Sequence, residues 1–207
     1  MHDGIWERRR VYDPALRFIH WWNALAVVAL LATAWSSELF ERGPFEKALW
    51  QAHIAIGYAL ITGLAARIAW GVVGPRHARF TDLWHPRAWL GVLRSRRLSA
   101  SRRFGHDELA SLAYLAAYAL LATMAMTGLA LAAIEHGAGP LAGALGDMAW
   151  LKKTFKEPHE AISTIVAVFV GLHLAMLVVH TRRDRNQIAR SMLTGVQYRR
   201  RDEAGHA

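Results

Sequence analysis

Four long apolar stretches constrain what this chain can fold into. They run over residues 16–35, 48–73, 109–134 and 158–179. Each is near or above the roughly 20 residues that an α-helix needs to cross the hydrocarbon core of a bilayer. Only helices and closed barrels satisfy the backbone in lipid, and these stretches do not alternate as barrel strands do. We therefore expect a single all-α integral membrane domain over residues 1–207, built as a bundle of four transmembrane helices.

Composition supports the membrane class. The chain is 54% hydrophobic and still carries 25 Lys and Arg residues, which suits several spans joined by charged loops better than one soluble core. Buried helices of a soluble protein are the alternative, but four such runs leave too little polar sequence to cover them. The absence of Cys excludes disulfides, thiolate-bound zinc, iron–sulfur clusters and covalently attached c-type haem within this chain.

The basic residues are distributed unevenly along the chain, and their distribution predicts the orientation. Most precede or begin the first stretch, or lie in the link at 74–108 and the tail at 180–207. Cytoplasmic segments of membrane proteins are enriched in Lys and Arg, so we expect both termini in the cytoplasm. Such segments beside anionic lipid account for the net charge of +9 without nucleic acid. The predicted cytoplasmic cations are Arg8, Arg9, Arg10, Arg17, Arg76, Arg79, Arg87, Arg94, Arg96, Arg97, Arg102, Arg103, Arg182, Arg183, Arg185, Arg190, Arg199, Arg200 and Arg201, and those on the other side are Arg42, Lys47, Lys152, Lys153 and Lys156.

Four histidines lie within or at the ends of the apolar stretches. His159 and His173 are fourteen residues apart in the fourth stretch, a spacing that returns to nearly the same helix face about 21 Å further along. With the termini inside, His20 lies near the inner end of the first stretch and His53 near the outer end of the second. Depth therefore pairs His20 with His173, and His53 with His159. Polar side chains at membrane depth are costly and usually functional.

Depth-matched histidines suggest a cofactor. Neutral imidazoles from facing helices can ligate an iron axially, one on each side of a flat macrocycle, and a bundle core is a usual place for such a site. The two pairs predict two haems, an inner one and an outer one. A proton relay, a transition-metal site and ordinary interfacial histidines are the alternatives that spacing leaves open. His180, seven residues after His173, could replace it as a ligand, bind a propionate or be solvated.

Arg67 follows His53 by fourteen residues, so the second stretch repeats the offset of the fourth. It should face the bundle at the depth of the inner pair. A guanidinium suits carboxylates, which predicts an ion pair with a haem propionate; snorkelling to the headgroups is the alternative. Gly57, Gly128 and Gly171 allow close helix approach and could also make room for a macrocycle.

Several segments carry a recognisable pattern over roughly residues 10–198. The chain resembles the prokaryotic cytochrome b561 family and its relative, the membrane cytochrome b subunit of nickel–iron hydrogenases. The matching pieces are Val11-Tyr12-Asp13-Pro14-Ala15-Leu16-Arg17-Phe18-Ile19-His20-Trp21, Gln51-Ala52-His53, Arg67-Ile68-Ala69-Trp70-Gly71-Val72-Val73-Gly74, Arg79-Phe80, Pro158-His159-Glu160 and Gly171-Leu172-His173.

This resemblance implies a four-helix membrane cytochrome with two b-type haems, each held by two histidines. Carried over to this sequence, the ligands are His20 and His173 for the inner haem and His53 and His159 for the outer, the same pairs that depth gives. The family implies the bacterial inner membrane, surrounding lipid, and electron exchange with ubiquinone or menaquinone. It also implies a partner redox protein, either a c-type cytochrome or a hydrogenase.

We therefore expect electron transfer across the membrane between the quinone pool and a redox partner. A cytochrome b subunit that anchors and serves a nickel–iron hydrogenase or a similar periplasmic enzyme is one alternative. A histidine-based proton or metal transporter is another, and it predicts a colourless protein. Nothing in the sequence resembles a nucleophile–base pair or a phosphate loop, so we expect no catalytic side chains of that kind.

Overall fold

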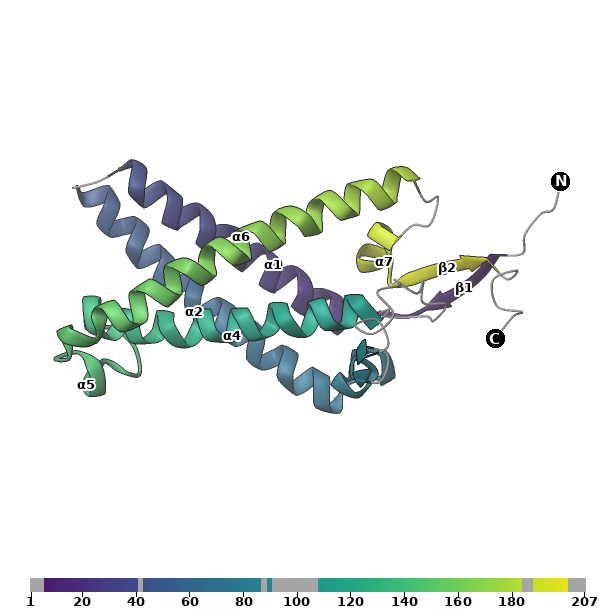
Figure 1. The fold of residues 1–207 in the computed structure, drawn as a ribbon, viewed down its shortest axis with the longest axis horizontal. Coiled ribbons are helices and arrows are strands. Elements are labelled where there is room, and N and C mark those ends of the chain that lie inside the picture. The colour runs from purple at the N-terminus through teal and green to yellow at the C-terminus, as the bar shows by residue number, and fades with distance from the viewer. Residues whose placement is uncertain (1–5, 41–42, 87–88, 91–107, 184–187, 201–207) are drawn as a thin grey trace. The chain divides into compact units, whose positions relative to one another are not determined.

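The structure is a computed structural model that describes residues 6–40, 43–86, 89–90, 108–183 and 188–200. Its main elements are four long helices, α1 (Pro14–Leu39), α2 (Pro44–Val73), α4 (Glu108–His136) and α6 (Lys152–Arg183) (Figure 1). All four contain stretches long and apolar enough to cross a membrane. The expectation of a helical protein with four membrane-spanning segments is confirmed.

Shorter elements connect and flank these helices. They are the 3₁₀ turns η1 (Arg76–Ala78), η2 (Phe80–Asp82) and η3 (Ala149–Leu151), the short helices α5 (Ala142–Leu145) and α7 (Ile188–Thr194), and the strands β1 (Trp6–Arg10) and β2 (Val196–Arg200). Several of the predicted cytoplasmic cations lie outside the described residues, namely Arg87, Arg94, Arg96, Arg97, Arg102, Arg103, Arg185 and Arg201, as does Arg42 on the other side.

The described residues form two compact units. The pocket unit comprises residues 20–66 and 117–171, and the terminal unit comprises residues 1–19, 67–116 and 172–207, as far as these are described. All four long helices contribute to the core of the pocket unit. Ala26 and Val27 of α1, Leu60 and Leu64 of α2, and Val166 of α6 are its buried centre, and residues of α4 such as Met124 pack against them. Within this unit the helices therefore form a bundle.

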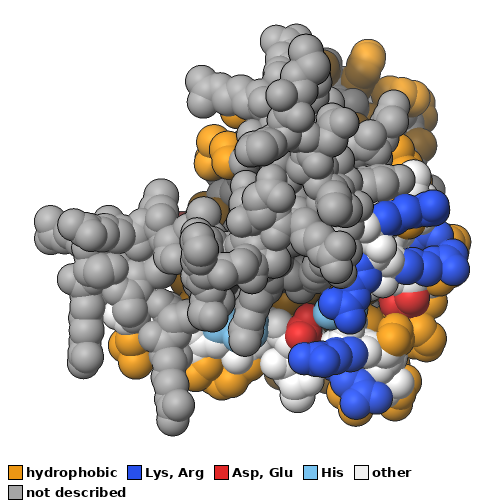
Figure 2. Space-filling view, turned by 90° about the vertical axis from the view of Figure 1, so that its right-hand side faces the viewer, with side chains coloured by type: hydrophobic (Ala, Val, Ile, Leu, Met, Phe, Trp, Pro, Cys, Tyr) orange, Lys and Arg blue, Asp and Glu red, His pale blue; other side chains and the backbone are white. Residues whose placement is uncertain are grey.

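The terminal unit joins the two ends of the chain. Strands β1 and β2 pair antiparallel, with Arg8 opposite Tyr198. Backbone N–H groups of Val11 and Tyr12 donate to the carbonyl oxygen of Gly195, which has a φ of +79° that favours glycine. The two terminal segments therefore lie next to each other, and their cytoplasmic location stays a prediction. Figure 2 views this end of the molecule and shows Lys and Arg side chains at its surface.

The start of α1 is set by its capping residue. Asp13 precedes Pro14, which suits the first helical position because it needs no N–H donor. One carboxylate oxygen of Asp13 accepts the backbone N–H of Leu16 at 3.0 Å, and it also accepts the indole N–H of Trp70 at 3.1 Å. The cap of α1 thus ties the beginning of the first span to the end of the second.

Helix α6 begins before the predicted apolar stretch. It starts at Lys152 and passes through Pro158, where the stretch was predicted to begin. Near its start, two ion pairs join residues four positions apart. Lys153 pairs with Glu157 at 3.4 Å, and Lys156 pairs with Glu160 at 3.5 Å. Such pairs stabilise a solvent-facing helical turn that hydropathy alone does not reveal.

A close approach of α1 and α2 depends on Gly63. The indole N–H of Trp22 donates to the carbonyl oxygen of Ala59 at 2.8 Å. A Cβ atom at Gly63 would lie 2.6 Å from Cδ1 of Trp22 and would also collide with the side chain of Asn23. Glycine at this position therefore permits the contact.

We predict that Gly63→Leu destabilises the protein by about 1–3 kcal/mol, because overpacking forces the neighbouring side chains and backbone to shift. The measurement is the thermal unfolding midpoint of the full chain in detergent. Gly143→Ala is the control, since a Cβ there meets nothing within 4 Å. Equal midpoints for Gly63→Leu and the unaltered chain would contradict this packing.

Candidate functional site

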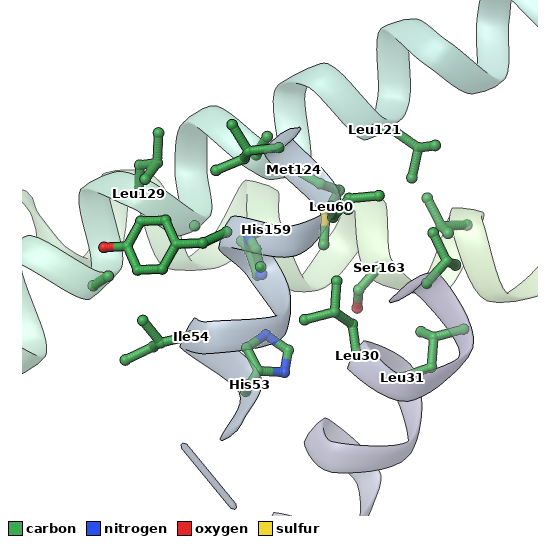
Figure 3. Close-up of a pocket in the computed structure, with 18 residues that line it drawn as sticks. Leu30, Leu31, His53, Ile54, Leu60, Leu121, Met124, Leu129, His159 and Ser163 are labelled. Atoms are coloured by element: carbon green, nitrogen blue, oxygen red, sulfur yellow. The ribbon is translucent and has the colours of Figure 1, made fainter. Parts of the chain in front are cut away.

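His53 and His159 line the same pocket of the pocket unit (Figure 3). The space between the lining side chains amounts to about 670 Å³, part of which is open to the surroundings. The wall is almost entirely apolar and comes from all four long helices, including Leu30, Leu31, Ile54, Leu60, Leu121, Met124, Leu129 and Val166.

Thr33 of α1 fixes the orientation of His53. Its Oγ1 lies 3.0 Å from Nδ1 of His53, and also 3.0 Å and 2.9 Å from the carbonyl oxygens of Ala29 and Leu30. We assign the hydroxyl hydrogen to these carbonyl oxygens, which can only accept, so that Oγ1 accepts the Nδ1–H of the imidazole. This tautomer leaves the lone pair of His53 on Nε2.

Thr127 of α4 makes the matching contact with His159. Its Oγ1 lies 2.8 Å from Nδ1 of His159, 2.8 Å from the carbonyl oxygen of Thr123 and 3.2 Å from that of Met124. The same reasoning assigns the proton to Nδ1 and the lone pair to Nε2. Both imidazoles of the pocket therefore offer Nε2 to a ligand.

Glycines keep the pocket open beside the histidines. Gly57 and Gly128 both line it. A Cβ at Gly57 would meet nothing within 4 Å, whereas one at Gly128 would lie 3.2 Å from Cε1 of His159. Gly171 does not line the pocket. The hydroxyl of Tyr58, another lining residue, is buried and has no hydrogen-bond partner among the described residues.

The donor set favours axial ligation of a flat group. Within the described part of the chain, no group of three or more His, Cys, Asp or Glu side chains could hold a metal ion. Structural and catalytic zinc sites need three or four protein ligands. Two neutral imidazoles in an apolar pocket instead match the ligands of a bis-histidine haem iron.

The other predicted ligands lie elsewhere. His20 belongs to the pocket unit, is half-buried, and has its ring 5.8 Å from that of Trp21 in an edge-on arrangement. His173 belongs to the terminal unit and is exposed within the chain. Neither lines the pocket of His53 and His159, and their pairing stays a prediction. His180 is in α6, but its side chain lies outside the described ones.

Arg67 is buried in the terminal unit, with 2% of its surface exposed. Its Nε donates to the hydroxyl of Tyr114, and its guanidinium carbon lies 4.7 Å from the ring centre of Phe80 and 5.3 Å from that of Tyr114. A snorkelling arginine would extend its charge away from the protein. Here the charge is held against two aromatic rings instead.

The glycines after Arg67 shape this arrangement. A Cβ at Gly71 would collide with the ring of Phe80, so glycine permits the ring to pack there. The carbonyl oxygen of Gly74 accepts the Nε–H of Arg79 at 2.7 Å. The conformation of the segment after α2 thus places the ring of Phe80 against the guanidinium of Arg67.

Comparison with known proteins identifies the family of this chain. A family model described as prokaryotic cytochrome b561 matches residues 11–195. The chain belongs to the prokaryotic cytochrome b561 family. Membership makes it a b-type cytochrome of the membrane, which binds haem b and transfers electrons. The matched range spans the positions of the four predicted histidine ligands and Arg67, whose roles stay predictions.

Curated relatives extend the comparison over most of the chain. Probable Ni/Fe-hydrogenase B-type cytochrome subunits from Azotobacter chroococcum mcd 1 and Azotobacter vinelandii are each 27% identical, with 89% of this chain and 86% of theirs aligned. The protein of the same description from Rhizobium leguminosarum bv. viciae is 25% identical, with 89% and 87% aligned. No solved structure matches the chain.

Sequence reasoning missed Thr33 and Thr127. Threonine inside an apolar helix commonly bonds to its own backbone, so neither residue stands out by composition. Their contacts with His53 and His159 depend on how neighbouring helices are rotated, which hydropathy does not give. A hydroxyl residue at the same depth as a candidate histidine is the signal that could have indicated them.

We predict that Gly57→Leu lowers the haem content per chain, because the added side chain enters open space beside the pocket histidines. Helical content by circular dichroism should be retained, since nothing lies within 4 Å of the new Cβ. The measurement is the pyridine haemochrome count of the purified protein. Ala55→Leu, at an exposed position of the same helix, is the matched control. Full haem content in Gly57→Leu would contradict a haem at this pocket.

Proposed function

We propose that this protein is a dihaem b-type cytochrome that transfers electrons across the bacterial inner membrane between the quinone pool and a redox partner. The observation that carries the proposal is the pair His53 and His159, which line one apolar pocket with both Nε2 atoms available. An electron-transfer site needs ligands that stay in place while the iron changes oxidation state. The hydrogen bonds to Thr33 and Thr127 meet that need.

The outer haem would be held by His53 and His159. When bound, it supplies an iron that cycles between Fe(II) and Fe(III). The residues of the chain provide two neutral axial ligands and an apolar wall that limits access of water to the pocket. The hydroxyl of Tyr58 could donate to a polar substituent of the macrocycle. No side chain of this pocket needs to make or break a covalent bond.

A second haem would be held by His20 and His173, an assignment that comes from their depth in the sequence. Fourteen residues of helix separate His173 from His159, which is about 21 Å along the helix axis. Two irons at these depths would divide the crossing into shorter electron-transfer steps. Arg67 would place a buried positive charge near the inner haem, where it would favour ionised propionates.

The partner is proposed from the relatives. Those named Ni/Fe-hydrogenase B-type cytochrome subunits align over most of their own length, which favours a hydrogenase-type redox enzyme on the periplasmic side. Such a subunit would both anchor the enzyme and accept its electrons. A c-type cytochrome is the other candidate partner. The arginine-rich terminal segments, paired through β1 and β2, would face the cytoplasm.

The function is tested in sealed lipid vesicles that contain the purified full chain and trapped ferricyanide. When dithionite is added outside, the trapped ferricyanide should be reduced only as fast as electrons cross the membrane through the protein. The loss of ferricyanide absorbance measures this rate. In detergent, anaerobic ubiquinol or menaquinol analogues should reduce the haem. Vesicles with His53→Ala protein are the control. Crossing at the same rate in both preparations, or haem that neither quinol reduces, would contradict the proposal.

We predict that Arg67→Leu lowers the occupancy or the midpoint potential of the inner haem, because a lost positive charge disfavours the electron-rich ferrous form. A tenfold effect on the one-electron equilibrium corresponds to about 59 mV. The measurement is a redox titration with optical detection. Arg76→Leu, at an exposed position after α2, is the control. An unchanged titration and haem count in Arg67→Leu would contradict this role.

A further inference from the structure

The two histidines of the pocket are supported in the same way from different helices. Thr33 of α1 contacts His53 of α2, and Thr127 of α4 contacts His159 of α6. Each threonine hydroxyl is anchored in turn to carbonyl oxygens one turn earlier in its own helix. The two contacts together engage all four long helices of the pocket unit.

We infer that Thr33 and Thr127 are positioning residues for the two axial ligands of the outer haem, an inference that rests on the proposed function. Each forms a relay in which the imidazole Nδ1–H donates to the hydroxyl oxygen and the hydroxyl donates to a helix carbonyl. The relay determines the tautomer, because the hydroxyl hydrogen is already directed to the carbonyl. It also limits rotation of the ring about its Cβ–Cγ bond.

Threonine is well suited to hold an imidazole in this way. Its β-branch restricts χ1, and the bond to the preceding turn selects the rotamer in which the hydroxyl faces its own helix. The oxygen is thereby fixed relative to the backbone of α1 or α4. The histidine ring of the neighbouring helix is held against an anchored acceptor. Its Nε2 would therefore keep one direction in the ferric and the ferrous states.

The neutral hydroxyl also sets the electronic character of the ligand. An acceptor at Nδ1–H raises the basicity of the imidazole, and a hydroxyl does so less than a carboxylate would. The more basic ligand stabilises the ferric state. Removing the hydroxyl should therefore shift the equilibrium of the outer haem toward the ferrous state and raise its midpoint potential.

The test replaces each threonine by valine, which keeps the branched shape and removes the hydroxyl. In Thr33→Val and Thr127→Val we expect haem affinity to fall by roughly tenfold. The ferrous-to-ferric ratio of the outer haem at a given ambient potential should rise by roughly threefold to tenfold, the effect of one hydrogen bond. The measurements are haem titration, a redox titration, and the electron paramagnetic resonance spectrum of the ferric protein, whose g-values report ring orientation.

Three variants serve as controls. Thr33→Ser retains the hydroxyl and should restore the potential and the g-values. Thr62→Val and Thr123→Val remove exposed hydroxyls that bond to the preceding turn, at 2.9 Å from the carbonyl oxygen of Tyr58 and 3.0 Å from that of Ala119. These two should leave both readouts unchanged, which separates loss of the relay from loss of a helix back-bond.

The outcomes distinguish this inference from the function on which it rests. If the unaltered chain binds no haem, or if His53→Ala and His159→Ala keep both haems, the proposed function fails. If the unaltered chain binds haem through these histidines but the valine variants keep its affinity, potential and g-values, the inference about the threonines is overturned. Potential and g-values are measured on the haem-bound fraction of each valine variant, and the serine variant provides the comparison.

Discussion

Polar groups inside a bilayer have no water to bond with, so each must find a partner within the protein. In this chain that constraint shapes the pocket. The imidazoles of His53 and His159 reach threonine hydroxyls, and these hydroxyls reach carbonyls of their own helices. Satisfying one nitrogen of each ring in this way leaves the other as the reactive position. The ligand geometry of the pocket is therefore a consequence of hydrogen-bond satisfaction in an apolar bundle.

Several other polar side chains of the helices are satisfied within the protein in the same way. The indole of Trp22 bonds to a backbone carbonyl of α2, and Asp13 satisfies both the first turn of α1 and the indole of Trp70. Arg67 is enclosed by Tyr114 and Phe80. Each contact joins residues distant in sequence, so polar satisfaction and helix packing are achieved by the same interactions. Small residues such as Gly63 and Gly71 permit the close approach that these contacts require.

Hydropathy predicted the four long helices because twenty or more apolar residues leave the backbone few alternatives in lipid. Depth along the spans also matched His53 with His159, and the structure brings both to one pocket. The position of a residue along a span gives its depth in the membrane but not the rotation of the helix about its own axis. The threonine partners of the histidines therefore could not be predicted. The aromatic partners of Arg67 belong to α4 and η2, and the sequence pattern around Arg67 does not indicate which residues of other elements contact it. Strand pairing between β1 and β2 joins opposite ends of the chain, and the early start of α6 depends on ion pairs outside the apolar stretch.

The central claim is that His53 and His159 ligate one and the same haem iron. Haem content per chain, measured by pyridine haemochrome in His53→Ala, His159→Ala and the double variant, tests it most directly. If the two residues share an iron, each single variant and the double variant should lose the same one of two haems, with no further loss in the double variant. Additive losses, or two haems retained in either single variant, would contradict the account.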